Sequence, residues 1–241
     1  MFHVGTRFHA CQDDSMATTG RRTTRRADAL SRERIVDAAI DILDTEGERA
    51  LTVRALAARL ATGSGAIYWH VGDKDGLLAA VTADVVGRAV TGVAGSVTPR
   101  EALFAIASEV FDVIAAHPWI GAQLAREPWQ PAMLRIFDSL GEQIRALGVP
   151  PESQFNVATA LLNHVLGVAC QYAAGARLAL RHSDRSTFLG EQAARWEQLN
   201  PSDYPFVTDI ASQLPGHDDR AQFIAGIDLI LAGVTAQLQA P

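Results

Sequence analysis

Hydrophobic positions repeat at helical spacing over most of the chain from about residue 30 onward. The first run lies between Ser31, a favourable N-cap residue, and Gly47, which ends the pattern; its apolar positions are Ile35, Ala38, Ala39, Ile42 and Leu43. A second, short run follows Thr52 over residues 53–60, and after the four-residue connector 61–64 a third covers residues 65–71. Two short helices joined this closely predict a helix-turn-helix.

The rest of the chain continues the helical pattern. A fourth run follows residue 73, and further helices are predicted over residues 100–116, 118–126, 131–147, 152–181, 185–199, 204–214 and 218–239. Prolines fall at the starts of these segments, where proline is tolerated. Alanine, the best helix former, occurs 41 times and tyrosine only 3 times, so the composition also favours an all-α fold.

One uncharged segment is long enough to cross a bilayer. Residues 153–176 form a run of 24 residues without a charged side chain. Seven of these residues are polar, however, and each would need a partner in lipid: Ser153, Gln154, Asn156, Thr159, Asn163, His164 and Gln171. We therefore interpret the segment as a core or interface helix and expect no membrane contact.

Charge is distributed unevenly along the chain. The net charge is -6, and the acidic excess lies after residue 94, since residues 95–241 hold 9 basic and 15 acidic side chains. Between residues 21 and 34, by contrast, six arginines stand against Asp28 and Glu33. Such a run can bind phosphates or can be a solvated tail, and charge alone leaves both interpretations open.

Several kinds of chemistry lack the residues they need. Cys11 and Cys170 are too far apart in sequence to indicate a disulfide framework or structural zinc, and no apolar signal segment begins the chain, so a reducing, cytoplasmic location is expected. His3 and His9 join Cys11 on a segment without hydrophobic periodicity, and we predict no metal site and no cofactor there. The common hydrolase, metalloprotease and phosphate-loop motifs are missing, so an enzyme is not expected.

The predicted helix-turn-helix indicates DNA binding, because its second helix can lie in a major groove, although such pairs also occur as plain packing motifs. Two segments make the pattern more specific, LTVRALA at residues 51–57 and IYWHVGDKDGLL at residues 67–78. They resemble the N-terminal domain of the tetracycline-repressor (TetR/AcrR) family, with similarity over about residues 31–90. Farther along, only residues 223–238 resemble the family, in its closing dimer helix.

The resemblance implies roles for individual residues. Arg54 matches a position that reaches a base, where arginine suits bidentate contact with guanine. Thr52, Tyr68, His70 and Lys74, the last being the only lysine of the chain, match positions that hold phosphates. Each residue also has an ordinary structural explanation, as a packing aromatic or histidine or as part of a solvated face.

The connector departs from the family pattern. It has Ala61 where the family usually has a turn glycine, and Ser64 is expected to act as the helix cap one residue later than usual. Base readout would then depend on Arg54, Ser64, the backbone at Gly65, methyl contacts from Ala66, and Trp69.

The last predicted helix carries an apolar stripe that should be buried: Phe223, Ile227, Ile230, Leu231, Val234 and Leu238. Small residues lie opposite it, namely Ala225, Ala232, Gly233 and Ala236. Together with residues 152–181, this helix is predicted to form a four-helix homodimer interface, the family's mode of assembly, which suits a palindromic operator.

The family also implies an effector pocket among the helices from about residue 100 to 181. The candidate ligand-binding residues are Phe104, Phe111, Trp119, Trp129, Phe137, Asn163, His164, Gln171 and Trp196. Each of them is more readily explained as a core residue than as a ligand contact. Asn163 and His164 are favoured because polar groups on an uncharged helix need a partner.

We therefore predict an extension with an Arg-rich arm over residues 1–28, a three-helix DNA-binding domain over 29–76, and a helical effector-binding and dimerisation domain over 77–241. The predicted function is a repressor that a small molecule releases from double-stranded operator DNA. An architectural DNA-binding protein without an effector and, less favoured, an all-α enzyme are the alternatives.

Overall fold

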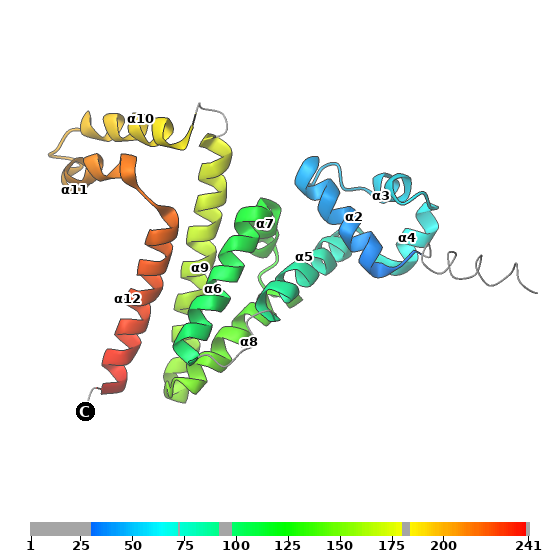
Figure 1. Ribbon diagram of the computed structural model, residues 1–241, viewed down its shortest axis with the longest axis horizontal. Helices are drawn as coiled ribbons and strands as arrows, with labels where there is room; N and C mark the ends of the chain where they lie inside the picture. Colours follow the sequence, from blue (N-terminus) through cyan, green and yellow to red (C-terminus); the bar gives the residue numbers. More distant parts are fainter. Residues whose placement is uncertain (1–29, 72, 92–97, 180–183, 240–241) are drawn as a thin grey trace, which may run out of the picture.

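The computed structural model describes residues 30–71, 73–91, 98–179 and 184–239 (Figure 1). Within these ranges every regular element is a helix, which confirms the all-α prediction. The predicted extension 1–28, with His3, His9, Cys11 and most of the Arg-rich run, lies outside the described residues.

The N-terminal domain is a small three-helix unit. It consists of α2 (Arg32–Thr45), α3 (Val53–Arg59) and α4 (Ser64–Val71). The hydroxyl oxygen of Ser31 accepts a hydrogen bond from the Arg34 backbone N–H at 3.3 Å, as the capping prediction requires. Fully buried side chains from all three helices, Ile35, Leu56 and Ile67 among them, form its core.

Helix α5 (Lys74–Thr91) runs without a break from this domain into the C-terminal bundle. The predicted boundary between residues 76 and 77 therefore falls inside its first turn. Leu77, Leu78 and Val81 are buried in the core that the two domains share.

The bundle is formed by α6 (Pro99–Ala116), α7 (Pro118–Arg126), α8 (Pro131–Ala146), α9 (Pro151–Ala179) and α12 (Asp219–Gln239). Helices α6, α8 and α9 pack against one another, α5 packs against α6 and α8, and α12 packs on α9 at the far edge (Figure 1). The chain bends by 108° between α6 and α7, at the Pro118 that begins α7. Proline is the first residue of each of α6, α7, α8 and α9, as its placement in the sequence predicted.

A smaller unit projects from the end of the bundle. It contains α10 (Arg185–Glu197), α11 (Pro205–Ile210) and the 3-10 helix η1 (Ala211–Gly216), which packs on α10. One helix had been predicted over residues 204–214. It changes to a 3-10 turn at Ala211 because the ring of Pro215 would clash with the Ala211 carbonyl of an α-helix.

Helix α9 is the one helix in the described residues that is long and apolar enough to cross a membrane. It lies in the bundle, in contact with α6, α7, α8 and α12. Of its most apolar 18-residue stretch, only 39% is buried there. The predicted core or interface helix is therefore covered over about two-fifths of this apolar stretch within a single chain.

The predicted stripe on α12 is mostly buried. Phe223, Ile227, Leu231 and Val234 pack against α9, and Gly226 lets the two helices approach so closely that a Cβ added there would meet the His164 ring at 2.1 Å. Ile230 is partly buried, and Leu238 is 40% exposed within the single chain, because α9 is the main partner of α12 and little covers its last turn.

Candidate nucleic-acid interface

Thr52 and Arg54 begin the first helix of the helix-turn-helix. Thr52 is the N-cap of α3, and its hydroxyl oxygen accepts a hydrogen bond from the Ala55 backbone N–H at 3.0 Å. Its O–H therefore remains free to donate, which is what a phosphate contact requires. The Arg54 side chain is exposed, whereas Arg59, one turn later, is bound by the carboxylates of Asp41 and Glu46.

The connector ends α3 in a Schellman motif. The Thr62 N–H donates to the Ala57 carbonyl at 2.9 Å, the Ala61 N–H donates to the Ala58 carbonyl at 3.3 Å, and Ala61 itself has a φ of +50°. This is the left-handed conformation that glycine adopts without strain. The chain thus keeps the turn although it has alanine at that position.

Helix α4 begins at Ser64, so the residue in the cap position is Gly63, and the prediction that Ser64 caps the helix was wrong. The Gly63 carbonyl accepts a bond from the Ala66 N–H at 3.1 Å. Ser64, Gly65 and Ala66 are all exposed on the leading edge of α4, and among the described residues no atom outside the adjacent α4 backbone and chain neighbours lies within 4 Å of a Cβ added at Gly65. Tyr68, Trp69 and His70 lie on α4, but their side chains are outside the described part of the structure.

Lys74 begins α5, and its ammonium group donates to the Glu48 backbone carbonyl at 2.8 Å. One of its three donors is therefore used to hold the loop between α2 and α3, and two remain for a phosphate. The carboxylate of Glu48 in turn accepts two hydrogen bonds from Arg126 of α7, at 3.0 and 2.9 Å. The bond to Arg126 lowers the pKa of Glu48.

A second contact joins the two domains through Trp119. The indole N–H of Trp119 donates to Asp44 of α2 at 2.7 Å, and Nδ1 of His117 lies 2.9 Å from the same carboxylate. Trp119 is 6% exposed and is held by this contact. Its predicted role as a ligand-binding residue does not fit, because its one polar group is directed at Asp44.

The predicted ligand-binding residues only partly come together. Trp129, Phe137 and Asn163 line an apolar cavity of about 350 Å³ between α7, α8 and α9. Its other lining residues, which sequence reasoning missed, are Leu124, Ala125, Pro128, Met133, Leu134, Phe155, Thr159, Leu162 and Leu166. Phe155, Thr159 and Leu162 recur on one face of α9, and this spacing was the available signal.

The remaining candidates lie elsewhere. His164 donates to the Phe223 carbonyl at 3.0 Å and stacks on the Phe223 ring, so it holds α12 against α9. Phe111 is buried in the core, Phe104 lies under the Arg100 guanidinium, Gln171 is exposed on α9, and Trp196 is on α10. None of these five lines the apolar cavity.

Comparisons with known proteins agree with this arrangement. Residues 35–81 match the N-terminal model of bacterial regulatory proteins of the tetR family, and residues 94–238 match the tetracyclin repressor-like C-terminal domain. An HTH-type transcriptional regulator of Saccharopolyspora erythraea is 30% identical over 212 residues, which cover 86% of this chain and 85% of that protein.

Two solved structures from Streptomyces coelicolor extend the comparison. The transcriptional regulator SCO7222, a TetR, is 50% identical, with a TM-score of 0.77 and coverage of 86% of this chain and 99% of that one. ActR in complex with (S)-DNPA is 24% identical, with a TM-score of 0.69 and coverage of 86% and 98%, and at that identity the likeness concerns the fold alone. The relatives named here are transcriptional regulators rather than enzymes.

Proposed function

The chain belongs to the TetR family of bacterial regulatory proteins, and from this premise we propose that it is a homodimeric repressor that a small molecule releases from a palindromic operator. Membership of the family implies that the protein regulates transcription by binding DNA. The proposal adds the direction of regulation, the assembly, the residues that read DNA and the site of the effector.

The observation that carries the proposal is the leading edge of the helix-turn-helix. Ser64, Gly65 and Ala66 expose a hydroxyl group, bare backbone and a methyl group at the start of α4, and Arg54 is exposed on α3. A major groove accepts a helix whose first turn carries small side chains, and guanine accepts a bidentate arginine. In this proposal Arg54 and the edge of α4 read bases, while Thr52, Lys74 and residues 68–70 contact DNA.

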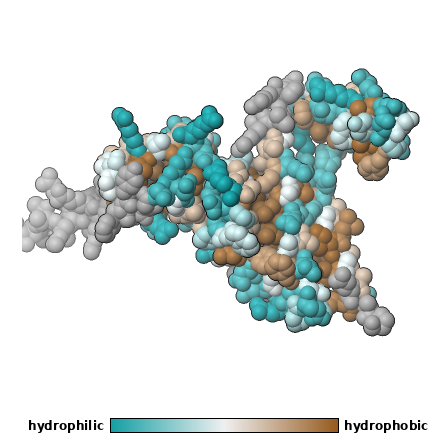
Figure 2. Space-filling view, turned by 180° about the vertical axis from the view of Figure 1, so that it is seen from behind, coloured by the Kyte–Doolittle hydropathy of each residue, from teal (hydrophilic) through white to brown (hydrophobic). Residues whose placement is uncertain are grey.

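A dimer is supported by the uncovered faces of α9 and α12. Ala225, Ala232, Gly233 and Ala236 of α12 are exposed, and Leu229 between them is 75% exposed. A groove of about 320 Å³ separates α12 from the first turns of α9. Figure 2 shows hydrophobic residues gathered on the bundle, whereas the DNA-binding domain is largely hydrophilic. Two such faces related by a two-fold axis would bury this surface and present two recognition helices.

The effector is proposed to bind in the apolar cavity of α7, α8 and α9. The cavity has the size and lining of small-molecule sites, with Asn163 and Thr159 as its polar groups and the exposed Trp129 at its mouth. Its α7 residues, Leu124 and Ala125, are adjacent to Arg126, which binds Glu48 of the DNA-binding domain. ActR, a regulator of the same fold, holds a small molecule in its solved complex. Occupation of the cavity would shift α7 and with it the DNA-binding domain.

The test is selection of duplexes from a random DNA pool by the purified full chain at near-physiological salt. We expect a palindrome whose half-sites lie about 34–36 Å apart, one turn of the duplex. Recovery of only salt-sensitive, sequence-indifferent binding would contradict the proposal and favour an architectural protein. With the palindrome as probe, a metabolite screen should find compounds that release it, and Phe137→Ala should abolish their effect while leaving operator affinity unchanged.

A further inference from the structure

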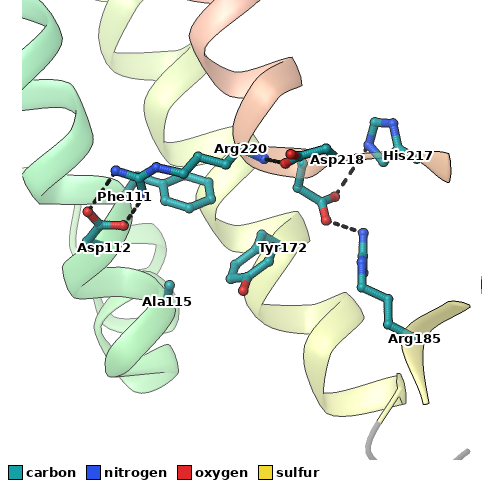
Figure 3. A pocket seen from close by; sticks show the side chains of 9 residues that line it. Phe111, Asp112, Ala115, Tyr172, Arg185, His217, Asp218 and Arg220 are labelled. Carbon is teal, nitrogen blue, oxygen red and sulfur yellow. Dashed lines mark hydrogen bonds and ion pairs between the residues drawn. The ribbon is translucent and has the colours of Figure 1, made fainter.

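A second cavity lies where α6, α9, α10 and α12 meet (Figure 3). Its volume is about 460 Å³, larger than that of the apolar cavity, and it is lined by Phe111, Asp112, Ala115, Tyr172, Arg185, His217, Asp218, Asp219 and Arg220. The lining combines an aromatic floor with a charged rim, a composition that the function proposed above does not use.

The floor is made by two rings from different helices. The centroids of Phe111 on α6 and Tyr172 on α9 are 5.2 Å apart. The Phe223 ring lies 4.6 Å from Phe111, and the Arg220 guanidinium lies 5.8 Å from the Phe111 centroid. Figure 3 shows the Tyr172 ring projecting from α9 into the space between Ala115 and Arg185. A flat apolar group can rest on this floor.

Every carboxylate of the rim is already engaged. Asp112 accepts two hydrogen bonds from Arg220, one of them at 3.1 Å, and Asp218 accepts bonds from the Arg220 and Ala221 backbone N–H groups as the cap of α12. Asp219 binds Arg185, with Nε2 of His217 at 3.5 Å. These acids therefore offer little to a cationic ligand.

The donors of the rim are not used up. Arg185 carries five N–H groups and gives one of them to Asp219, and its side chain is only one-third exposed. No described residue forms a hydrogen bond with the Tyr172 hydroxyl. The unused donors of Arg185 and Tyr172 lie beside aromatic rings. This combination favours a ligand that has a flat ring and anionic oxygen atoms.

We propose that this cavity is a binding site for an aromatic carboxylate. Its ring lies on Tyr172, which packs against the buried Phe111, and its carboxylate accepts hydrogen bonds from the free N–H groups of Arg185 and from the Tyr172 hydroxyl. Arg185 keeps its bond to Asp219 when the ligand binds. The Asp219 carboxylate is therefore not left buried without a partner. The site is separate from the apolar cavity and does not depend on that cavity being the effector site.

Calorimetric titration of the full chain with 2-naphthoate tests the proposal. We expect one saturable site per chain and at least about tenfold weaker binding of 2-naphthylmethylamine, which has a similar size but is cationic. Tyr172→Phe should weaken binding about fivefold and Arg185→Gln at least about tenfold, since they remove a neutral and a charge-assisted hydrogen bond.

Two matched variants locate the site. Arg195→Gln makes the same change of charge on an exposed position of α10 and should leave binding unchanged, and so should Phe137→Ala in the apolar cavity. The proposal is overturned if no saturable heat is observed, if the amine binds as tightly, or if Phe137→Ala removes binding. Tyr172→Phe keeps the ring and the Arg185–Asp219 pair, so it decides the question even if Arg185→Gln unfolds the region around α10.

Discussion

The two domains differ in what they leave exposed. Among the residues whose side chains are described, all the exposed large hydrophobic side chains belong to the C-terminal domain: Trp129, Leu134, Phe155, Tyr204, Phe206, Leu229 and Leu238. The DNA-binding domain buries its apolar side chains and exposes Arg54, Ser64 and small residues. The DNA-binding domain thus has a polar surface with its apolar residues buried, as binding to DNA requires, whereas the C-terminal domain exposes the apolar surface on which the proposed dimer and effector site depend.

The largest effect is expected on dimerisation, when a charge is introduced into this apolar surface. Leu229→Asp places a carboxylate on each side of the proposed two-fold interface, where the charges face apolar surface and each other. The dimer dissociation constant should rise at least about a hundredfold, corresponding to roughly 3 kcal/mol. Sedimentation at micromolar concentration measures it, and the chain should keep its helical circular dichroism because Leu229 is exposed in the monomer.

Ala194→Asp, on an exposed position of α10, serves as the control and should remain dimeric. A wild-type chain that sediments as a monomer would refute the proposed assembly. So would a Leu229→Asp variant whose dimer is as tight as that of the wild type.

The polar surface is tested by two substitutions in the DNA-binding domain. Arg54→Ala should cost roughly 1–3 kcal/mol of operator binding and relax specificity at one base pair. Lys74→Ala should weaken binding to all duplexes alike and reduce the salt dependence, because an ammonium group contacts phosphate whatever the sequence. Titrations of the selected palindrome and of single-base variants separate the two outcomes.

Lys74 also holds the Glu48 carbonyl, so the thermal stability of its variant has to be measured alongside. Arg195→Ala, far from the DNA-binding domain, should leave both affinity and specificity unchanged. Equal loss for every sequence in both variants would show that Arg54 does not read a base.

The contact between the two domains should depend on acidity. Arg126 lowers the pKa of Glu48 below its ordinary value of 4.5, so the stabilisation is fully present above that value and is lost as the pH falls through the lower, folded pKa. Glu48→Gln should reduce the free energy of unfolding at pH 7 by about 0.5–1 kcal/mol, a small amount because the pair is partly exposed. Denaturant unfolding at pH 7 and pH 3 should show this difference shrinking at the lower pH.

The exposed Glu142→Gln provides the matched control, with no such pH-dependent difference. A Glu48→Gln effect of the same size at both values would mean that shape rather than charge holds the domains together at this contact.

The sequence predicted helices better than it predicted contacts between them. Helix positions follow from local periodicity, and most observed boundaries lie within two residues of the expected ones; the 3-10 turn before Pro215 is the main departure. Arg54 and Ser64 both lie in the helix-turn-helix. Since the local pattern of apolar and polar positions predicts this motif, it also predicts that the two side chains are exposed. The apolar cavity joins Trp129, Phe137 and Phe155 from separate segments, and packing between helices decides which aromatic residues meet there. Trp119 and His164 turned out to hold helices in place because Asp44 and Gly226, distant in sequence, lie beside them.

The smallest predicted effect concerns the connector of the helix-turn-helix. Ala61 has a φ of +50°, a conformation that costs an alanine roughly 1–2 kcal/mol relative to glycine. Ala61→Gly removes this cost but gives the unfolded chain more freedom, worth about 0.4–1 kcal/mol. The free energy of unfolding should therefore rise by about 0.5 kcal/mol, the difference between these two terms.

Ala58→Gly, three residues earlier and inside α3, should instead lower it by about 0.5–1 kcal/mol. Opposite signs for the same substitution, measured by denaturant unfolding, would establish that backbone conformation at residue 61 is the cause; a loss of stability in both variants would mean that Ala61 is not strained.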